Sequence, residues 1–227
     1  MRARLFRLAA LALFALVPIV AGPAAAVDAP ARPQTVIVGL DLSKSNPLVM
    51  DAAYAARVGQ RTADELDTLP VRSRIMLRTF GSYDSSANAL KIDEVISSRA
   101  KPETVAEGIG ALISAMPKLV GEGKLKAQGY TNIVSFLETT SQLVDCEASD
   151  VRIILLTDGF EDSEYAKLAG GGSLPRPQAL YPGCAELMML GVGQGGGSPT
   201  VTKRVSAQWQ GWAEAAGFRK FTGLYDW

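Results

Sequence analysis

Asp41-Leu42-Ser43-Lys44-Ser45 follows the apolar run Thr35 to Leu40, and this junction decides the fold. The apolar run is short, rich in β-branched residues and bounded by polar residues. Such a run is typical of a strand that is buried on both faces of a parallel sheet. Alternate residues of an extended chain point the same way, so the oxygens of Asp41, Ser43 and Ser45 can converge on one point.

A second apolar run, Val151 to Leu156, also ends in polar residues, and Asp158 is among them. If the two runs are neighbouring parallel strands, Asp41 and Asp158 meet at the same edge of the sheet. Open α/β sheets bind their ligands there, outside the carboxyl ends of the strands. Carboxylate and hydroxyl oxygens are hard ligands, so the set suits Mg²⁺, Mn²⁺ or Ca²⁺ and not zinc or copper.

Three pieces of the sequence resemble the metal-ion-dependent adhesion site (MIDAS) of the von Willebrand factor A (vWA) domain family. They are Asp41-x-Ser43-x-Ser45, Gly129-Tyr130-Thr131-Asn132 and Leu156-Thr157-Asp158-Gly159. The resemblance spans roughly residues 33 to 225 and is to the exported bacterial type. It implies that Ser43, Ser45 and Thr131 touch the metal and that Asp41 and Asp158 often act through water. Tyr130 departs from the glycine of many members, which leaves the shape of that loop open.

Two other interpretations of these residues stay open. Asp41, Ser43 and Ser45 can merely cap the next helix, which we expect to begin near Pro47. Alternatively, the chain keeps the five residues without using a metal, because motif matches need structural context. The acidic run 160–164 beside the site also has two interpretations. We prefer a solvated loop, because charged runs usually face water. Alternatively, the run shapes partner choice or recruits a second cation.

Residues 1–26 have the pattern of a secretory signal peptide. Arg2, Arg4 and Arg7 precede an apolar stretch, Leu8 to Val20, and small residues precede the expected cleavage after Ala26. An uncleaved anchor is the alternative, but the stretch is shorter than the roughly 20 residues of a membrane span. We therefore expect an exported protein, periplasmic or secreted, without stable membrane insertion after cleavage. Residues 27–33 would form a linker and 34–227 one vWA domain.

The charge balance argues against two classes of partner. The chain has 23 basic and 23 acidic residues, and the signal peptide holds three of the basic ones, which leaves 20 − 23 = −3. A mildly acidic chain has no basic footprint for nucleic acid or for an anionic membrane surface.

Cys146 and Cys184 are the two cysteines of the sequence. An exported chain with two cysteines favours one disulfide, here between the end of the helix after Thr131 and the entry of the strand that follows the glycine-rich loop 170–183. Two free buried thiols are the alternative.

Alternating strands and helices predict a doubly wound, Rossmann-like α/β fold. We expect a mostly parallel six-stranded sheet with helices on both faces and one antiparallel edge strand, Ala89 to Ile96. The expected helices run from Pro47 to about Leu66, from Pro102 to Pro117, from Thr131, and from Ser198–Pro199 to a cap at Gly217, with Trp209 and Trp212 in the core.

The residues favour a binding module over an enzyme. It would hold a divalent cation, preferably Mg²⁺, and accept a Glu or Asp of a protein partner at an open position of the metal. A metal-independent structural subunit of an envelope complex is the alternative. A metal-dependent hydrolase that uses Asp158 is a weaker one, because the chain has no histidine to act as general base. The glycine-rich stretch Gly191 to Gly197 lacks the spacing and the position of a dinucleotide fingerprint.

Overall fold

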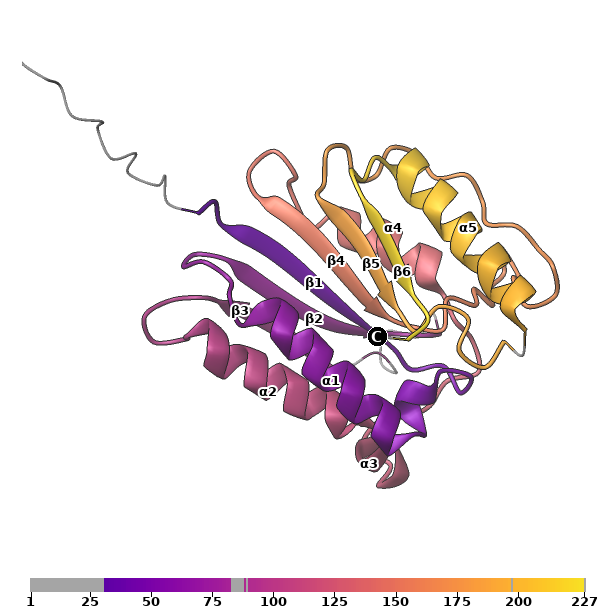
Figure 1. Cartoon of the computed structure of the whole chain (residues 1–227), viewed down its shortest axis with the longest axis horizontal. Helices are drawn as coiled ribbons and strands as arrows, with labels where there is room; N and C mark the ends of the chain where they lie inside the picture. The colour runs from indigo at the N-terminus through magenta and orange to yellow at the C-terminus, as the bar shows by residue number, and fades with distance from the viewer. Residues whose placement is uncertain (1–30, 83–87, 89, 197, 227) are drawn as a thin grey trace, which may run out of the picture. The chain divides into compact units, whose positions relative to one another are not determined.

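The computed structural model describes residues 31–82, 88, 90–196 and 198–226. The expected signal peptide, residues 1–26, and the start of the expected linker lie outside these described residues. Among the described helices, none is both long and apolar enough to cross a bilayer. Figure 1 shows the described chain as a twisted sheet between two layers of helices.

The described strands form a six-stranded sheet in the order β3-β2-β1-β4-β5-β6. Neighbouring strands are parallel except β2 and β3, so the predicted mostly parallel sheet with one antiparallel edge is confirmed. Only a short connection joins β2 to β3, too short for the crossover that a parallel pair needs. The strands are β1 (Gln34–Asp41), β2 (Arg74–Phe80), β3 (Lys91–Val95), β4 (Asp150–Leu156), β5 (Glu186–Leu190) and β6 (Phe221–Leu224).

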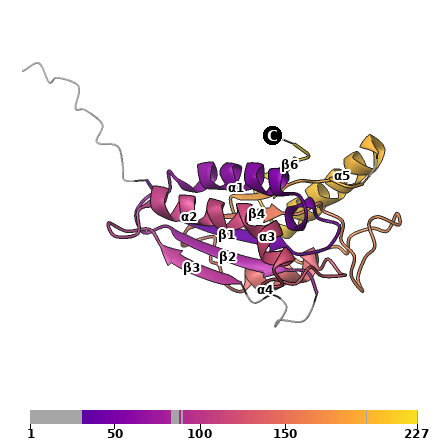
Figure 2. The ribbon, with the colours of Figure 1, turned by 90° about the horizontal axis from the view of Figure 1, so that it is seen from below.

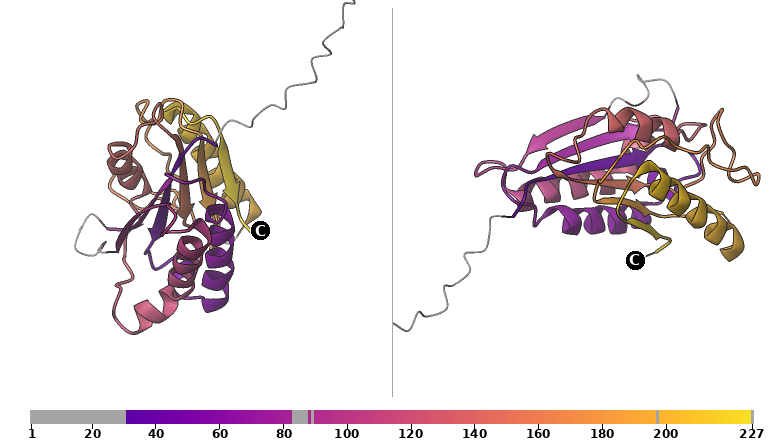
Figure 3. Two further views of the ribbon diagram at one scale, coloured as in Figure 1. Left: turned by 90° about the vertical axis from the view of Figure 1, so that its left-hand side faces the viewer. Right: turned by 90° about the horizontal axis from the view of Figure 1, so that it is seen from above.

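Helices cover both faces of the sheet, as a doubly wound fold requires. Helices α1 (Ala52–Leu66), α2 (Pro102–Ser114) and α3 (Met116–Gly121) pack on one face. Helices α4 (Ile133–Ser141) and α5 (Pro199–Ala216) pack on the other. In Figure 2, α1 and α4 lie on opposite sides of the strands, and α1 and α2 run side by side in Figure 3.

The last helix has the predicted bounds and the predicted core residues. Ser198 caps its amino end through a hydrogen bond to the N–H of Val201, and Gly217 ends it with a φ of 101°. This positive φ favours glycine, which has no Cβ to clash. Trp209 and Trp212 are 0% and 3% exposed, which confirms their place in the core.

The helix expected from Pro47 to Leu66 is interrupted. Pro47–Val49 forms a short 3₁₀ helix, η1, and α1 begins only at Ala52. The reason is a second cap, because the Asp51 side chain accepts a hydrogen bond from the Tyr54 N–H and restarts the helix. The amino end that follows the first loop therefore belongs to η1 and not to α1. Pro117, expected to end α2, lies instead in the first turn of α3.

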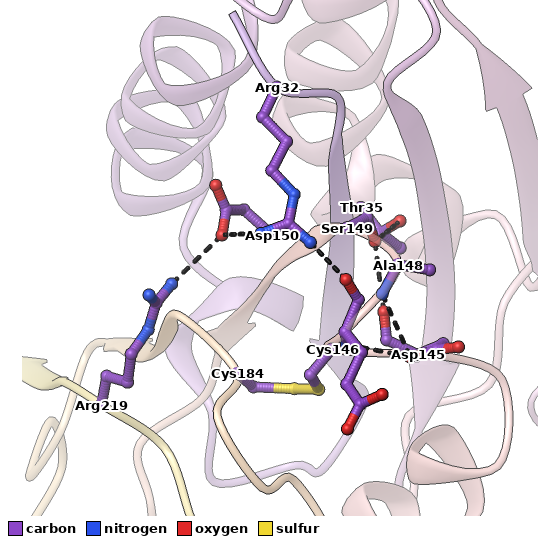
Figure 4. Close-up of polar contacts among 10 residues, drawn as sticks. Arg32, Thr35, Asp145, Cys146, Ala148, Ser149, Asp150, Cys184 and Arg219 are labelled. Atoms are coloured by element: carbon purple, nitrogen blue, oxygen red, sulfur yellow. Dashed lines mark hydrogen bonds and ion pairs between the residues drawn. A yellow bond between two sulfur atoms is a disulfide. The ribbon is translucent and has the colours of Figure 1, made fainter.

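Cys146 and Cys184 form the predicted disulfide, with their Cα atoms 4.9 Å apart. The bond lies near the amino end of β4 (Figure 4). There Asp150 makes ion pairs with Arg219 at 3.2 Å and with Arg32 at 3.7 Å. These contacts fasten the end of the sheet opposite to the one where the predicted site lies.

Candidate metal centre

The carboxyl ends of β1 and β4 lie side by side, as predicted. Leu40 pairs with Leu156 in parallel register, so Asp41 and Thr157 follow at the same edge of the sheet. Asn46, which is 1% exposed, joins the two ends. Its Nδ2 donates to the carbonyl oxygens of Asp41 at 3.1 Å and Leu156 at 3.0 Å. Sequence reasoning missed Asn46, because nothing in its local pattern shows a contact with a residue 110 positions away.

The first loop is organised by the carboxylate of Asp41, which is fully buried. Its Oδ1 accepts the Ser43 N–H at 2.8 Å, and its Oδ2 accepts the Thr157 hydroxyl at 2.7 Å. The Oγ atoms of Ser43 and Ser45 are 3.3 Å apart. Asp41 therefore holds the loop in a shape that brings both serine hydroxyls together.

The second loop is fixed by backbone hydrogen bonds on each side. The Gln128 N–H donates to the Leu42 carbonyl at 2.8 Å, next to the first loop. Thr131, which is 2% exposed, exchanges two hydrogen bonds with Asp162 at 3.1 and 3.0 Å. Tyr130, the departure from the family pattern, is 60% exposed, so its side chain fits outside this packing.

The third loop presents Asp158, which is fully buried. Its Oδ1 accepts the Phe160 N–H at 2.9 Å, whereas no atom of the described residues makes a hydrogen bond with its Oδ2. Gly159 has a φ of +76°, and its carbonyl accepts the indole N–H of Trp209 at 2.8 Å. The last helix thus positions the turn that carries Asp158.

Four of the five predicted ligands line the same cavity. Ser43, Ser45, Thr131 and Asp158 line one cavity of about 810 Å³. Asp41 does not line this cavity; it lies beneath the first loop through its bond to the Ser43 N–H.

Burial sets the protonation of the two aspartates. Burial and, to a smaller extent, the negative charge of Asp158 together raise the pKa of Asp41 from 3.8 to about 7, against the hydrogen bonds from Ser43 and Thr157. Burial also raises the pKa of Asp158, against the Phe160 N–H and the nearby Ser45 hydroxyl. Two carboxylates that lack a counter-charge disfavour each other's ionised form. A cation between them would relieve both effects.

Glu161 is a residue whose role sequence reasoning missed. We preferred a solvated loop for the acidic run, but Glu161 is fully buried. Its Oε2 accepts the N–H groups of Ile133 at 2.8 Å and Val134 at 3.1 Å, at the amino end of α4. Glu161 therefore satisfies the first turn of this helix, and Thr131 does not, since Asn132 is the cap residue and α4 begins at Ile133. Burial raises the pKa of Glu161, and these N–H groups act in the opposite direction.

The donor set fits a hard divalent cation. Within the described part of the chain, no three His, Cys, Asp or Glu side chains gather in a way that could hold a metal. The candidate centre relies on hydroxyl oxygens besides its two carboxylates, and such oxygens suit Mg²⁺, Mn²⁺ or Ca²⁺. The Oδ2 of buried Asp158 has no hydrogen-bond partner among the described residues, and a buried carboxylate oxygen without a partner is costly, so a cation there would be favourable.

No family model and no curated protein matches the chain. Solved structures with similar architecture include proximal thread matrix protein 1 from the mussel byssus, with a TM-score of 0.42, 14% identity and coverage of 70% of this chain and 38% of that one. Manganese-loaded TRAP protein of Plasmodium vivax has a TM-score of 0.46, 15% identity and coverage of 86% and 69%. The pilus adhesin SpaC of Lactobacillus rhamnosus GG has a TM-score of 0.46, 13% identity and coverage of 86% and 28%.

Proposed function

We propose that this chain is an exported binding module of the vWA type, which holds a divalent cation and binds a carboxylate of a protein partner. Ser43, Ser45 and Thr131 would hold the cation directly, and Asp41 and Asp158 would hold it through water. Bound there, the cation would supply a Lewis-acidic position for the Glu or Asp of the partner. The disulfide supports export, because such bonds persist mainly in oxidising compartments.

One observation carries the proposal. Three hydroxyl-bearing side chains and Asp158 come from three separate loops and line the same cavity, with Asp158 Oδ2 buried and unpaired among the described residues. Helix capping alone does not explain this arrangement, because Asp41, Ser43 and Ser45 do not cap η1. The cap of η1 is Asn46, whose Oδ1 accepts the Leu48 N–H at 3.2 Å.

Calorimetric titration of Mg²⁺, Mn²⁺ and Ca²⁺ into the purified protein tests the proposal. We expect saturable binding that is lost in Ser43→Ala and in Asp158→Asn. Ser97→Ala is the matched control for the serine, because the Ser97 hydroxyl accepts the N–H groups of Arg99 and Ala100 in a turn after β3 and does not line the cavity. A protein that binds none of the three ions, while its unfolding is cooperative, would refute the proposal.

A metal-independent assembly subunit is the second candidate. It is favoured by Asp41, whose two carboxylate oxygens already accept hydrogen bonds within the loops, so that this residue has a structural role without any ion. Capture of the natural partner separates the candidates. Binding that survives both chelator and Asp41→Ala would favour the metal-independent subunit, and binding lost in both would favour the metal-bridged carboxylate.

We propose binding and not catalysis. The sequence contains no histidine, so a hydrolase here would rely on Asp158 and a metal-bound water alone. A screen of ester and phosphate substrates with each metal tests this point. Turnover that disappears in Asp158→Ala would make the protein an enzyme.

A further inference from the structure

The cavity is larger than a metal site needs. A cation with six waters fills about 180 Å³, at roughly 30 Å³ for each water. The cavity holds about 810 Å³, and apolar residues line it besides the oxygen-bearing ones. Phe160, Ala169 and Val201 line the cavity together with Gly196, and we call these four residues the apolar end.

Burial and hydrogen bonds hold the residues of the apolar end in place. Phe160 is 9% exposed, and its backbone N–H donates to Asp158 Oδ1 at 2.9 Å, which ties this residue to the turn that carries Asp158. A Cβ on Gly196 would lie 2.5 Å from the Phe160 ring, which shows how closely the glycine-rich loop approaches it. Leu168, beside Ala169, is fully buried and donates its N–H to the Glu161 carbonyl at 3.0 Å.

The same segment is also tied to the last helix. Arg204 of α5 donates to the Leu168 carbonyl at 2.9 Å. Ala169 and Val201 are therefore held on two packed elements, and their side chains are respectively exposed and half-buried. A ligand can reach these apolar side chains without displacing the core.

Two lysines of the lining can steer an acidic ligand, but Asp158, Glu161 and Asp162 line the cavity as well, so the attraction depends on the bound cation. Lys44, between the two serines, lines the cavity and is exposed, and no described residue makes an ion pair with it. Lys167 lines it too, in a long 3.8 Å ion pair with Asp162. Exposed lysines beside a carboxylate site steer acidic segments toward it.

We propose that the cavity binds an acidic residue together with an adjoining apolar side chain of the same partner segment. The carboxylate would lie at the oxygen-bearing end, and the apolar side chain would lie against Phe160, Ala169 and Val201. This inference rests on the proposed function, because it assigns the carboxylate to the metal. It adds that the partner residue next to this acid is preferably apolar.

Titration of acetate, butyrate and hexanoate into the Mg²⁺-saturated protein tests the inference. Burial of each methylene group is expected to strengthen binding by up to about fourfold, so affinity rises along the series. In Ala169→Phe the new ring occupies the apolar end, and we expect acetate to bind as before while the rise with chain length is lost. Val201→Thr keeps the shape of the side chain and is expected to weaken hexanoate binding several-fold.

Ala148→Phe is the matched control, since Ala148 is an exposed alanine near the amino end of β4 (Figure 4). This variant is expected to keep the full dependence on chain length. If the protein binds Mg²⁺ but has equal affinity for all three carboxylates, the role assigned to the apolar end is overturned and the proposed function stays intact. Absence of Mg²⁺ binding in the same protein would overturn the proposed function itself. The capped dipeptide Glu-Leu is then expected to bind about tenfold more tightly than Glu-Ser, by the same transfer term.

Discussion

Replacement of Asp41 by asparagine is expected to stabilise the metal-free protein and to abolish its response to Mg²⁺. The carboxylate is fully buried near Asp158, and its pKa lies at about 7. An asparagine oxygen can still accept the Ser43 N–H. The Thr157 hydroxyl can turn to accept a hydrogen bond from the amide instead of donating one. The substitution therefore removes the buried charge and keeps both contacts of the first loop.

The magnitude follows from the shift in pKa. A rise from 3.8 to about 7 is about three pH units, which corresponds to about 4 kcal/mol at 1.36 kcal/mol per unit. The folded protein holds its proton longer than the unfolded chain does, so the stability of the wild type falls as pH rises from about 4 to about 7. Above about pH 7 the ionised Asp41 carboxylate has its full cost in folding free energy, and below about pH 4 the protonated group has none. Relaxation around the charge reduces the cost, and we expect a gain of about 1–3 kcal/mol near pH 8.

Urea unfolding at about pH 4.5, 6 and 8, with chelator or with excess Mg²⁺, measures both effects. Asp64→Asn is the matched control, because Asp64 is an exposed acid on α1. With chelator, the gain from Asp41→Asn should grow with pH, and Mg²⁺ should stabilise only the wild type and the control. The reasoning is refuted if the variant is less stable than the wild type near pH 8 with chelator, or if Mg²⁺ stabilises both equally.

Four further outcomes are expected. Glu161→Ala should lower the free energy of unfolding by about 1–3 kcal/mol and weaken Mg²⁺ binding by displacing Thr131. Glu161→Gln should keep most of the stability and most of the Mg²⁺ affinity, as urea unfolding and calorimetry would show. Equal losses in the two variants would contradict the capping role. Asn46→Ala should lower the free energy of unfolding by about 2 kcal/mol, because the carbonyl groups at the ends of β1 and β4 lose their donor. An unchanged midpoint of thermal unfolding would count against this role of Asn46. Reduction of the Cys146–Cys184 bond should cost about 2–4 kcal/mol but leave the Mg²⁺ affinity of the folded protein unchanged, because the bond lies at the other end of the sheet. Mg²⁺ affinity should rise with pH up to about 7, with release of the Asp41 proton, and an affinity that does not change with pH would speak against ionised Asp41 in the complex.

Sequence patterns predicted the fold well where burial follows a simple period. The runs that became β1 and β4 are buried on both faces, so their hydrophobicity is nearly continuous and their ends are clear. Trp209 was placed in the core by its helical spacing, and the structure adds its hydrogen bond to the Gly159 carbonyl. That bond was not predictable, because it depends on how α5 docks on the sheet.

Residues with roles in loop packing escaped prediction. Glu161 lies in a charged run that normally faces water, and only the tertiary fold brings it under the first turn of α4. Asn46 caps η1 and Asp51 caps α1, and these two caps interrupt the helix that Pro47 was expected to begin. The chain uses both caps, and the hydrophobic pattern predicted neither of them.

The same contrast governs what can be inferred about a partner. Asp41, Ser43 and Ser45 share one loop, so their spacing alone indicates a cluster of oxygens and hence a class of ion. The apolar end comes from elements that are far apart in the chain, and Ala169 and Val201 have no spacing that marks them as neighbours. The kind of atom that a partner would offer to a bound metal can therefore be argued from sequence. The kind of side chain next to that atom can be inferred only from the lining of the cavity. Variants at Ala169 therefore test the inference from the structure, and variants at Ser43 test the inference from the sequence motif.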